Sequence, residues 1–265
     1  MKPPVIDQPW ASLRRYTAAR IGLGRAGASV PTAAHLAFQQ AHAEARDAVH
    51  APLDVDALLA GLRALGEAPV HVHSRAPDRP TYLQRPDLGR RIDDASAVRL
   101  AALRSPVVDL AFVLADGLSA LALQRQALPL FAALRERLLL EGGWSWAPPV
   151  VATQARVALG DEIGALLNAR CVVVLIGERP GLSAPDSLGV YFSWAPHPGL
   201  LDAQRNCISN VRPEGLAPAA AAAKLHVLLR EARTRQLSGV ELKDVQDDRA
   251  VAAEPSGLMQ RLGGA

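Results

Sequence analysis

The chain has 265 residues, of which 49% are hydrophobic and 4% aromatic, so it is long enough for a substantial core and too apolar for a disordered or fibrous protein. The net charge of +3 arises from interleaved acidic and basic residues, and no basic run carries aromatic side chains, which excludes the usual pattern of a nucleic-acid-binding surface. Two cysteines are too few for a disulfide framework or a zinc motif, so we expect a reducing compartment. No apolar run is long enough to span a membrane, so we expect a soluble, intracellular protein.

The N-terminal part of the sequence is typical of helices separated by glycine and proline. Helices are expected at residues 11–23, 32–50, 55–65 and 93–104. Thr32 and Asp54 stand where the second and third of these helices require N-caps. The glycines of Gly22–Gly27 follow a helical pattern rather than a strand, so we interpret them as helix termination and not as a dinucleotide-binding motif.

A short strand is expected within this region at Val70–His73, where apolar and polar residues alternate. His71 and His73 share one side of the strand, but no third metal ligand is near in the sequence, and we predict no metal site. The loop that follows carries a dense cluster of charges, for which a salt-bridged loop and a partner interface are nearly equal alternatives. The cluster comprises Arg85, Asp87, Arg90 and Arg91.

From Pro106 onward, short apolar runs alternate with helical segments. Strands are expected at 107–115, 149–153, 171–177 and 188–194, with a short irregular stretch at 207–211. Helices are expected at 128–140, 161–169 and 217–237. This alternation predicts an α/β fold at residues 105–239, with a mostly parallel sheet and helices on both faces. The charged segment 240–265 is expected to be a loosely attached tail.

Familiar catalytic motifs are missing from the sequence. Ser119 follows a predicted buried strand, but its surroundings, A-D-G-L-S-A, lack the glycines of a nucleophile elbow, so capping of the next helix is the preferred interpretation. There is no P-loop, and no nucleophile, base and orienting group stand at recognisable spacing. We therefore predict no catalytic residue in this chain.

Polar residues near the ends of three predicted strands form the best candidate site. Gln154–Val157 follows the strand at 149–153, Glu178–Gly181 follows the buried strand at 171–177, and Cys207–Asn210 lies in the irregular stretch. In open α/β sheets, ligands bind beyond the carboxyl ends of the strands. Backbone amides and one carboxylate at such an edge suit a neutral ligand rich in amides better than a triphosphate.

Five motifs, in collinear order from Trp10 to about Gly239, resemble the small (light) chain of ethanolamine ammonia-lyase. They are L-R-R-Y-T-A-A-R-I-G-L-G-R-A-G (Leu13–Gly27), Y-L-Q-R-P-D-L-G-R-R (Tyr82–Arg91), A-D-G-L-S (Ala115–Ser119), G-E-R-P-G-L (Gly177–Leu182) and R-N-C-I-S-N (Arg205–Asn210). The resemblance implies a subunit of an adenosylcobalamin-dependent lyase that converts ethanolamine to acetaldehyde and ammonia by radical rearrangement. It also implies a Rossmann-like domain, preceded by a helical region at 1–104 that contacts a large TIM-barrel chain.

The same resemblance implies that the cobalamin lies between the two chains, with small-chain contacts at Val157, Glu178 and Cys207. The Glu178 carboxylate is expected to accept a hydrogen bond from a corrin side-arm amide, and Cys207 to act through its backbone or by packing, without a cobalt–sulfur bond. The cofactor is expected to keep its own base on cobalt, because no histidine stands in a D-x-H-x-x-G motif. His197 comes nearest, with Ala195 where the motif requires aspartate.

Assembly and location are expected to follow the same family. The resemblance implies a trimer of paired heterodimers, located in the cytoplasm or within a bacterial microcompartment, with neither nucleic acid nor membrane as a partner. Two other classes stay open as alternatives: a stand-alone cobalamin-binding or Rossmann-like module without a catalytic partner, and an unrelated nucleotide-binding α/β enzyme. The missing glycine fingerprint disfavours the second of these.

Overall fold

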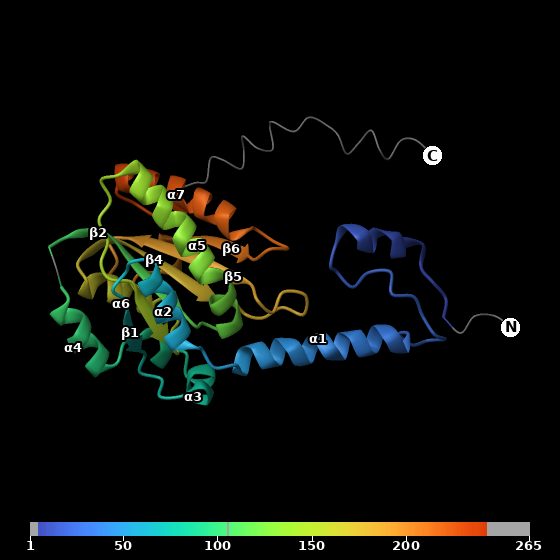
Figure 1. The fold of residues 1–265 in the computed structure, drawn as a ribbon. Coiled ribbons are helices and arrows are strands. Elements are labelled where there is room, and N and C mark those ends of the chain that lie inside the picture. The colour runs from blue at the N-terminus through green and yellow to red at the C-terminus, as the bar shows by residue number, and fades with distance from the viewer. Residues whose placement is uncertain (1–4, 105, 243–265) are drawn as a thin grey trace.

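The computed structural model describes residues 5–104 and 106–242 (Figure 1). The α-helices are α1 (Thr32–His50), α2 (Val55–Ala64), α3 (Arg79–Gln84), α4 (Asp94–Ala102), α5 (Ala120–Glu141), α6 (Leu159–Leu166) and α7 (Pro218–Arg235). The strands are β1 (Val70–His73), β2 (Val108–Ala115), β3 (Val150–Thr153), β4 (Ala169–Gly177), β5 (Leu188–Trp194) and β6 (Arg205–Val211). Short 3₁₀ helices lie at Pro9–Tyr16, Leu88–Arg90, Asp202–Gln204 and Gly239–Glu241. The tail predicted at 240–265 lies, from residue 243 onward, outside the described residues.

Across the described ranges, six strands form a single sheet in the order β1-β3-β2-β4-β5-β6. β1, β3, β2 and β4 pair in parallel, whereas β5 pairs antiparallel with both β4 and β6. The predicted α/β fold with a mostly parallel sheet is confirmed. Because β5 runs back along β4, β6 again ends at the carboxyl edge of β4, which brings Ser209 and Asn210 to Glu178.

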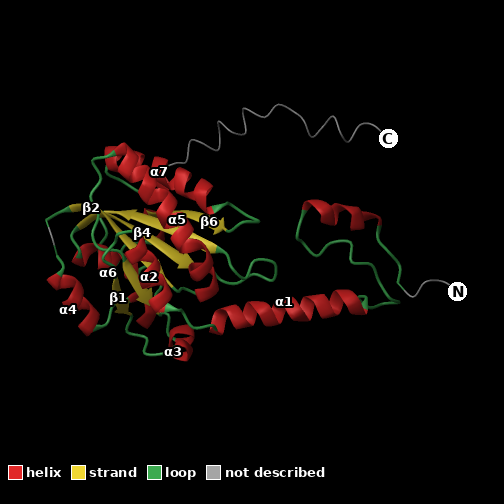
Figure 2. Cartoon of the chain, in the orientation of Figure 1, coloured by secondary structure: helices red, strands yellow, loops and turns green. Residues whose placement is uncertain are grey.

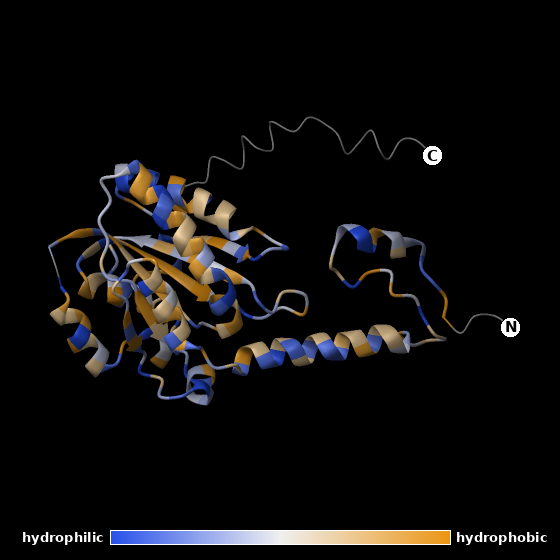
Figure 3. Cartoon of the chain, in the orientation of Figure 1, coloured by the Kyte–Doolittle hydropathy of each residue, from blue (hydrophilic) through white to orange (hydrophobic). Residues whose placement is uncertain are grey.

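Helices cover both faces of the sheet (Figure 2), because β2 and β4 are apolar on both sides. Leu110, Phe112 and Leu114 pack with α2, α5 and α7 in one core. Ala111 and Val113 pack with α4 and α6 in the other. Figure 3 shows the central strands as a largely apolar layer. Two cores thus hold the parallel strands in place, so that the loops at their carboxyl ends start from a rigid base.

The stretch predicted as short and irregular at 207–211 belongs to β6, which pairs with β5, and the pairing is irregular between Ile208 and Val211. One side of β6 packs on the core through Ile208, so the strand contains too few apolar residues for the sequence alone to indicate it. Cys207 therefore lies within a strand rather than in a loop. Since side chains alternate along a strand, Cys207 is on the side of the sheet opposite Ile208.

The helix predicted at 128–140 is the second half of α5, a helix of 22 residues with Pro129 in its interior. Ser119 caps α5 as predicted, and its Oγ accepts a hydrogen bond from the Ala122 N–H at 3.2 Å. An interior proline costs about 3 kcal/mol, but the buried neighbours Leu130 and Phe131 anchor the helix to the core on its C-terminal side. Neither α5 nor any other helix in the described part of the chain combines the length and the apolar composition of a membrane span.

The N-terminal segment differs most from the sequence prediction. In place of a helix at 11–23, the structure has the 3₁₀ helix Pro9–Tyr16, in which no residue is buried. Most helical stability in proteins comes from packing, so an unburied segment has little reason to form a longer helix. Thr32 is the first residue of α1 and not its cap, since Pro31 takes that position. Asp54 does cap α2 as predicted, accepting a hydrogen bond from the Ala57 N–H at 2.9 Å.

Candidate functional site

Two neighbouring cavities at the carboxyl edge of β3 and β4 form what we call the edge hollow. The Glu178 cavity, of about 410 Å³, is lined by Tyr82, Gly117, Leu118, Arg156, Val157, Ile176, Gly177, Glu178, Arg179, Tyr191 and Ser209. The Cys207 cavity, of about 700 Å³, is lined by Pro86, Arg90, Arg91, Arg156, Val157, Ala158, Glu162, Tyr191, Pro198, Gly199, Leu200, Leu201, Asp202, Arg205 and Cys207. Arg156, Val157 and Tyr191 line both cavities, so the two share a wall.

The three residues predicted to bind a ligand meet at this edge hollow. Val157 lies in the shared wall, Glu178 in the smaller cavity and Cys207 in the larger one. They come from three separate segments: the loop after β3, the end of β4, and β6. The structure therefore brings the predicted residues to one place, while their role in binding stays a prediction.

Val157 owes its position to the loop after β3, which the buried carboxylate of Asp116 holds. Asp116 comes directly after β2 and accepts hydrogen bonds from the backbone N–H groups of Gln154 at 2.8 Å and Ala155 at 2.9 Å. Burial raises the pKa of Asp116, while the two N–H groups and Arg79 act in the opposite direction. The A-D-G-L-S motif alone does not indicate this role, because the two N–H groups lie 38 and 39 residues further along the chain.

Arg79 and Arg156 both stack on the ring of Tyr82, which lines the Glu178 cavity. Their guanidinium carbons lie 4.7 and 4.2 Å from the ring centroid, within cation–π range. Nη1 of Arg79 is also 3.6 Å from Oδ2 of Asp116, and the Tyr82 hydroxyl donates to the Ala155 carbonyl at 3.1 Å. Side chains of α3, the β2 end and the loop after β3 thus form one polar cluster behind the hollow. Sequence reasoning missed it because its members are remote in the chain.

The Glu178 carboxylate, at the end of β4, is held by three donors of this chain. Its Oε2 accepts hydrogen bonds from the Ser187 hydroxyl at 2.5 Å and from the Asn210 N–H at 3.3 Å. Its Oε1 accepts a hydrogen bond from the Ser209 hydroxyl at 2.5 Å. A carboxylate offers about four lone-pair positions, so one acceptor position stays available to a ligand. The sequence could not indicate these donors, because two of them come from β6, where no strand was predicted.

Cys207 lies directly opposite Tyr191 in the register of β6 and β5. Burial raises the pKa of the Cys207 thiol, and a hydrogen bond with Tyr191 acts in the opposite direction. Burial also raises the pKa of the Tyr191 hydroxyl. Both groups therefore stay protonated near neutral pH. That state suits packing and hydrogen bonding better than nucleophilic attack or metal ligation, which require the thiolate.

The two histidines of β1 do not line the edge hollow. Nε2 of His71 is 3.1 Å from Oγ1 of Thr153, and Nδ1 of His73 is 2.7 Å from the Ser74 carbonyl oxygen. Both histidines therefore have structural partners. Within residues 5–104 and 106–242, no group of three or more His, Cys, Asp or Glu side chains is arranged to hold a metal ion.

The parallel strands and the hollow at their carboxyl edge define an α/β protein with the geometry at which open sheets bind ligands. The family model described as ethanolamine ammonia-lyase light chain (EutC) matches residues 7–243. The chain belongs to this ethanolamine ammonia-lyase light-chain family, and it is therefore a lyase subunit.

Relatives named "ethanolamine ammonia-lyase small subunit" match nearly the whole chain. The protein of Azotobacter vinelandii (strain DJ / ATCC BAA-1303) is 63% identical over 246 residues, covering 92% of this chain and 91% of the relative. That of Pseudomonas aeruginosa (strain UCBPP-PA14) is 58% identical over 251 residues, covering 94% and 92%. That of Pseudomonas fluorescens (strain SBW25) is 53% identical over 266 residues, covering 98% and 96%. The family predicted from the five sequence motifs is confirmed, and the words "small subunit" imply a large-subunit partner.

Proposed function

We propose that this chain is the small subunit of an adenosylcobalamin-dependent ethanolamine ammonia-lyase, which converts ethanolamine to acetaldehyde and ammonia by radical rearrangement. In this proposal, residues 105–239 form a Rossmann-like domain that covers the cobalamin. The helical region 1–104 contacts a large TIM-barrel subunit, which binds the substrate and contains the catalytic residues. Membership of the light-chain family supports the proposal.

One structural observation supports the proposal independently of family membership. Val157, Glu178 and Cys207 come from three separate segments and line two neighbouring cavities with a shared wall at the carboxyl edge of the sheet. A chance grouping of three such residues at the edge where α/β sheets bind ligands is a weaker explanation than a shared ligand. The cobalamin is the ligand that we assign to them.

The polar groups of the hollow fit a ligand with amide side arms. Each primary amide of a corrin both donates and accepts hydrogen bonds. The remaining acceptor position of Glu178 can receive an amide N–H. Arg179 also lines the Glu178 cavity, and its guanidinium can donate to an amide oxygen.

The cofactor, when bound, supplies the radical through homolysis of its cobalt–carbon bond. The residues of this chain bind and orient the cofactor and exclude water from the hollow. No histidine of this chain stands in a D-x-H-x-x-G motif, so no residue of this chain would replace the cofactor's own base on cobalt. The protonated thiol of Cys207 contributes packing and not a bond to the metal.

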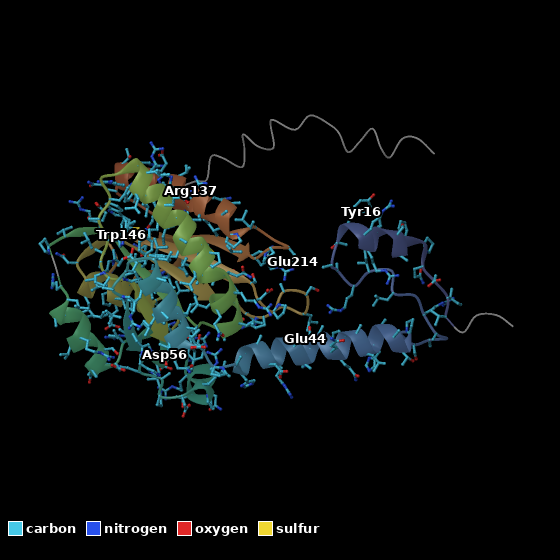
Figure 4. The ribbon with its side chains drawn as sticks, viewed as in Figure 1. Tyr16, Glu44, Asp56, Arg137, Trp146 and Glu214 are labelled. Carbon is cyan, nitrogen blue, oxygen red and sulfur yellow. The ribbon has the colours of Figure 1, made fainter. Side chains whose placement is uncertain are left out.

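Exposed aromatic residues of the N-terminal segment support a subunit contact in the region 1–104. Trp10 and Tyr16 are 65% and 73% exposed. Tyr16 projects from the segment at a distance from the sheet (Figure 4). Groups of exposed apolar side chains are typical of interaction surfaces. We assign this surface to the large subunit, in an assembly of three paired heterodimers located in the cytoplasm or in a bacterial microcompartment.

Co-expression with a large subunit tests the proposal. Ethanolamine deamination should require both chains and adenosylcobalamin, and either chain alone should be inactive. Full activity of the large subunit alone would contradict the role of this chain. If this chain alone bound adenosylcobalamin as tightly as the complex does, the alternative of a stand-alone cobalamin-binding module would be favoured instead.

A further inference from the structure

The wall of the Cys207 cavity contains four arginines and two carboxylates, and the pairing of these charges leaves two arginines over. The arginines are Arg90, Arg91, Arg156 and Arg205, and the carboxylates are those of Glu162 and Asp202. The pairing of these side chains decides which charges remain for a ligand.

Arg91 and Arg205 are neutralised by carboxylates of this chain. Nε of Arg91 lies 3.2 Å from Oε2 of Glu162. Arg205 pairs with the buried carboxylate of Asp161 and with Asp202, whose Oδ1 is 2.6 Å from Nη1. Each carboxylate that lines the cavity is therefore matched by an arginine, and neither of these two arginines has a free charge to offer.

Arg90 and Arg156 have no such counter-charge. Arg90 is exposed and, within residues 5–104 and 106–242, its side chain forms no hydrogen bond or ion pair, although Arg85 of the same loop pairs with Asp87 at 2.7 Å. Arg156 stacks on Tyr82 and donates to its carbonyl at 3.2 Å, which leaves the positive charge unneutralised. The charged cluster of this loop is thus salt-bridged in part, and Arg90, its one charged side chain without a partner in the described structure, lines the cavity.

We propose that Arg90, with Arg156, binds the phosphodiester of the cofactor's nucleotide tail in the Cys207 cavity, an inference that rests on the proposed function. The corrin side arms of cobalamin are neutral amides, and the phosphodiester carries its negative charge. Arginine is well suited to phosphate, because its fork of N–H donors matches two phosphate oxygens. The Glu178 cavity is lined by Arg179 as well as by the Glu178 carboxylate, which opposes a phosphate and suits an amide N–H. We therefore assign the nucleotide tail to the Cys207 cavity, where Arg90 and Arg156 have no carboxylate partner, and the amide edge of the corrin to Glu178.

The test compares two cofactors that differ in the nucleotide tail, which includes the phosphodiester. Adenosylcobalamin contains it, and adenosylcobinamide has the same corrin and adenosyl group without the nucleotide tail. In the complex of both subunits, Arg90→Gln should weaken adenosylcobalamin binding roughly tenfold. It should leave adenosylcobinamide binding unchanged. Arg85→Gln, a control in the same loop whose side chain pairs with Asp87 and does not line the hollow, should bind both cofactors like the wild type.

A salt series provides a second readout of the same contact. Because salt screens charge–charge attraction, adenosylcobalamin affinity should fall with added sodium chloride more steeply for the wild type than for Arg90→Gln. The series decides the question where adenosylcobinamide binds too weakly to measure. Equal losses for the two cofactors, or a wild-type affinity in Arg90→Gln, would overturn the inference. Absence of adenosylcobalamin binding in the wild-type complex would instead overturn the proposed function.

Discussion

The Ser209 hydroxyl of β6 donates a hydrogen bond to the Glu178 carboxylate at the end of β4, with Oγ and Oε1 2.5 Å apart. This contact spans the width of β5, since β4 and β6 are not neighbours in the sheet. Glu178 therefore links the carboxyl ends of β4 and β6, and it also lines the hollow. Its loss should affect both the fold and the ligand site.

Replacement of Glu178 by alanine should lower adenosylcobalamin affinity and also stability. The sequence alone predicts an intact fold, because Glu178 lies beyond the strand end. The structure revises that expectation, since Ser187, Ser209 and Asn210 each lose an acceptor. We expect a decrease of about 1 kcal/mol in the free energy of unfolding, measured by urea denaturation. Glu178→Gln retains an acceptor oxygen and should recover part of the lost stability. An alanine variant as stable as the wild type would show that the hydrogen bonds of Glu178 do not stabilise the fold.

Cys207 should tolerate a smaller side chain and not a larger one. Cys207→Ala removes a protonated thiol that packs beside Tyr191, so cofactor affinity in the complex should change by no more than about threefold. Cys207→Phe places a much larger side chain in the wall of the cavity of about 700 Å³ and should weaken binding by roughly tenfold or more. Equilibrium titration with adenosylcobalamin measures both. A large loss in the alanine variant would indicate a chemical role for the thiol.

Asp116 should influence the site through the loop that precedes Val157. Asp116→Asn leaves the Gln154 or Ala155 N–H facing an amide donor, which should destabilise the fold by about 1–3 kcal/mol and weaken cofactor binding. Asp109 offers a matched control near the opposite end of β2, where it accepts hydrogen bonds from Ser145. Asp109→Asn should also lower stability but should leave cofactor affinity unchanged at a temperature where the variant is folded. Equal effects of the two variants on affinity would argue against a specific role of Asp116.

His71 should make stability depend on pH on the acid side of neutrality. Burial, followed by the charges of His73 and Arg99, lowers the pKa of His71 from its ordinary value of 6.5, while Asp56 and Asp93 oppose the shift. A group whose pKa is lower in the folded state stabilises the fold above its unfolded pKa, and this contribution is lost as the pH falls. The free energy of unfolding should therefore decrease as the pH falls from 6.5 through the lowered pKa.

Denaturant titrations of variants over this pH range identify the source of that decrease. His71→Gln should show a shallower decrease than the wild type, because it removes the titrating group while retaining a polar partner for Thr153. His35→Gln, at an exposed position of α1, should retain the wild-type slope. If His71→Gln had the wild-type slope, another group would be responsible.

The sheet could be predicted where strands are buried on both sides, because their apolar runs are continuous. β4 contains Val172–Ile176 and was recognisable on that basis. β6 packs on the core on one side and presents polar residues on the other, so its pattern was too weak. The helix predicted at 11–23 failed for a different reason: its amphipathic pattern has no buried face in the described structure. The proposed division at residues 104 and 239 stays a prediction.

The positions of the site residues could be predicted, but their surroundings could not. The rule for carboxyl edges indicated the segments Gln154–Val157, Glu178–Gly181 and Cys207–Asn210, and the family resemblance then pointed to Val157, Glu178 and Cys207 within them. The roles of Asp116 and Ser209 depend on hydrogen bonds between residues far apart in the sequence. Such pairs follow from tertiary packing, which a single sequence does not display. The binding role of all three predicted residues stays to be measured.

The most direct test of the edge hollow as the cobalamin site is the adenosylcobalamin affinity of the two-subunit complex with Val157→Phe, since Val157 lines both cavities. Val98→Phe on α4, where the side chain is 70% exposed and outside the hollow, is the matched control. We predict that Val157→Phe loses affinity at least tenfold and that Val98→Phe binds like the wild type. An intact complex with Val157→Phe that binds adenosylcobalamin as tightly as the wild type would contradict the account.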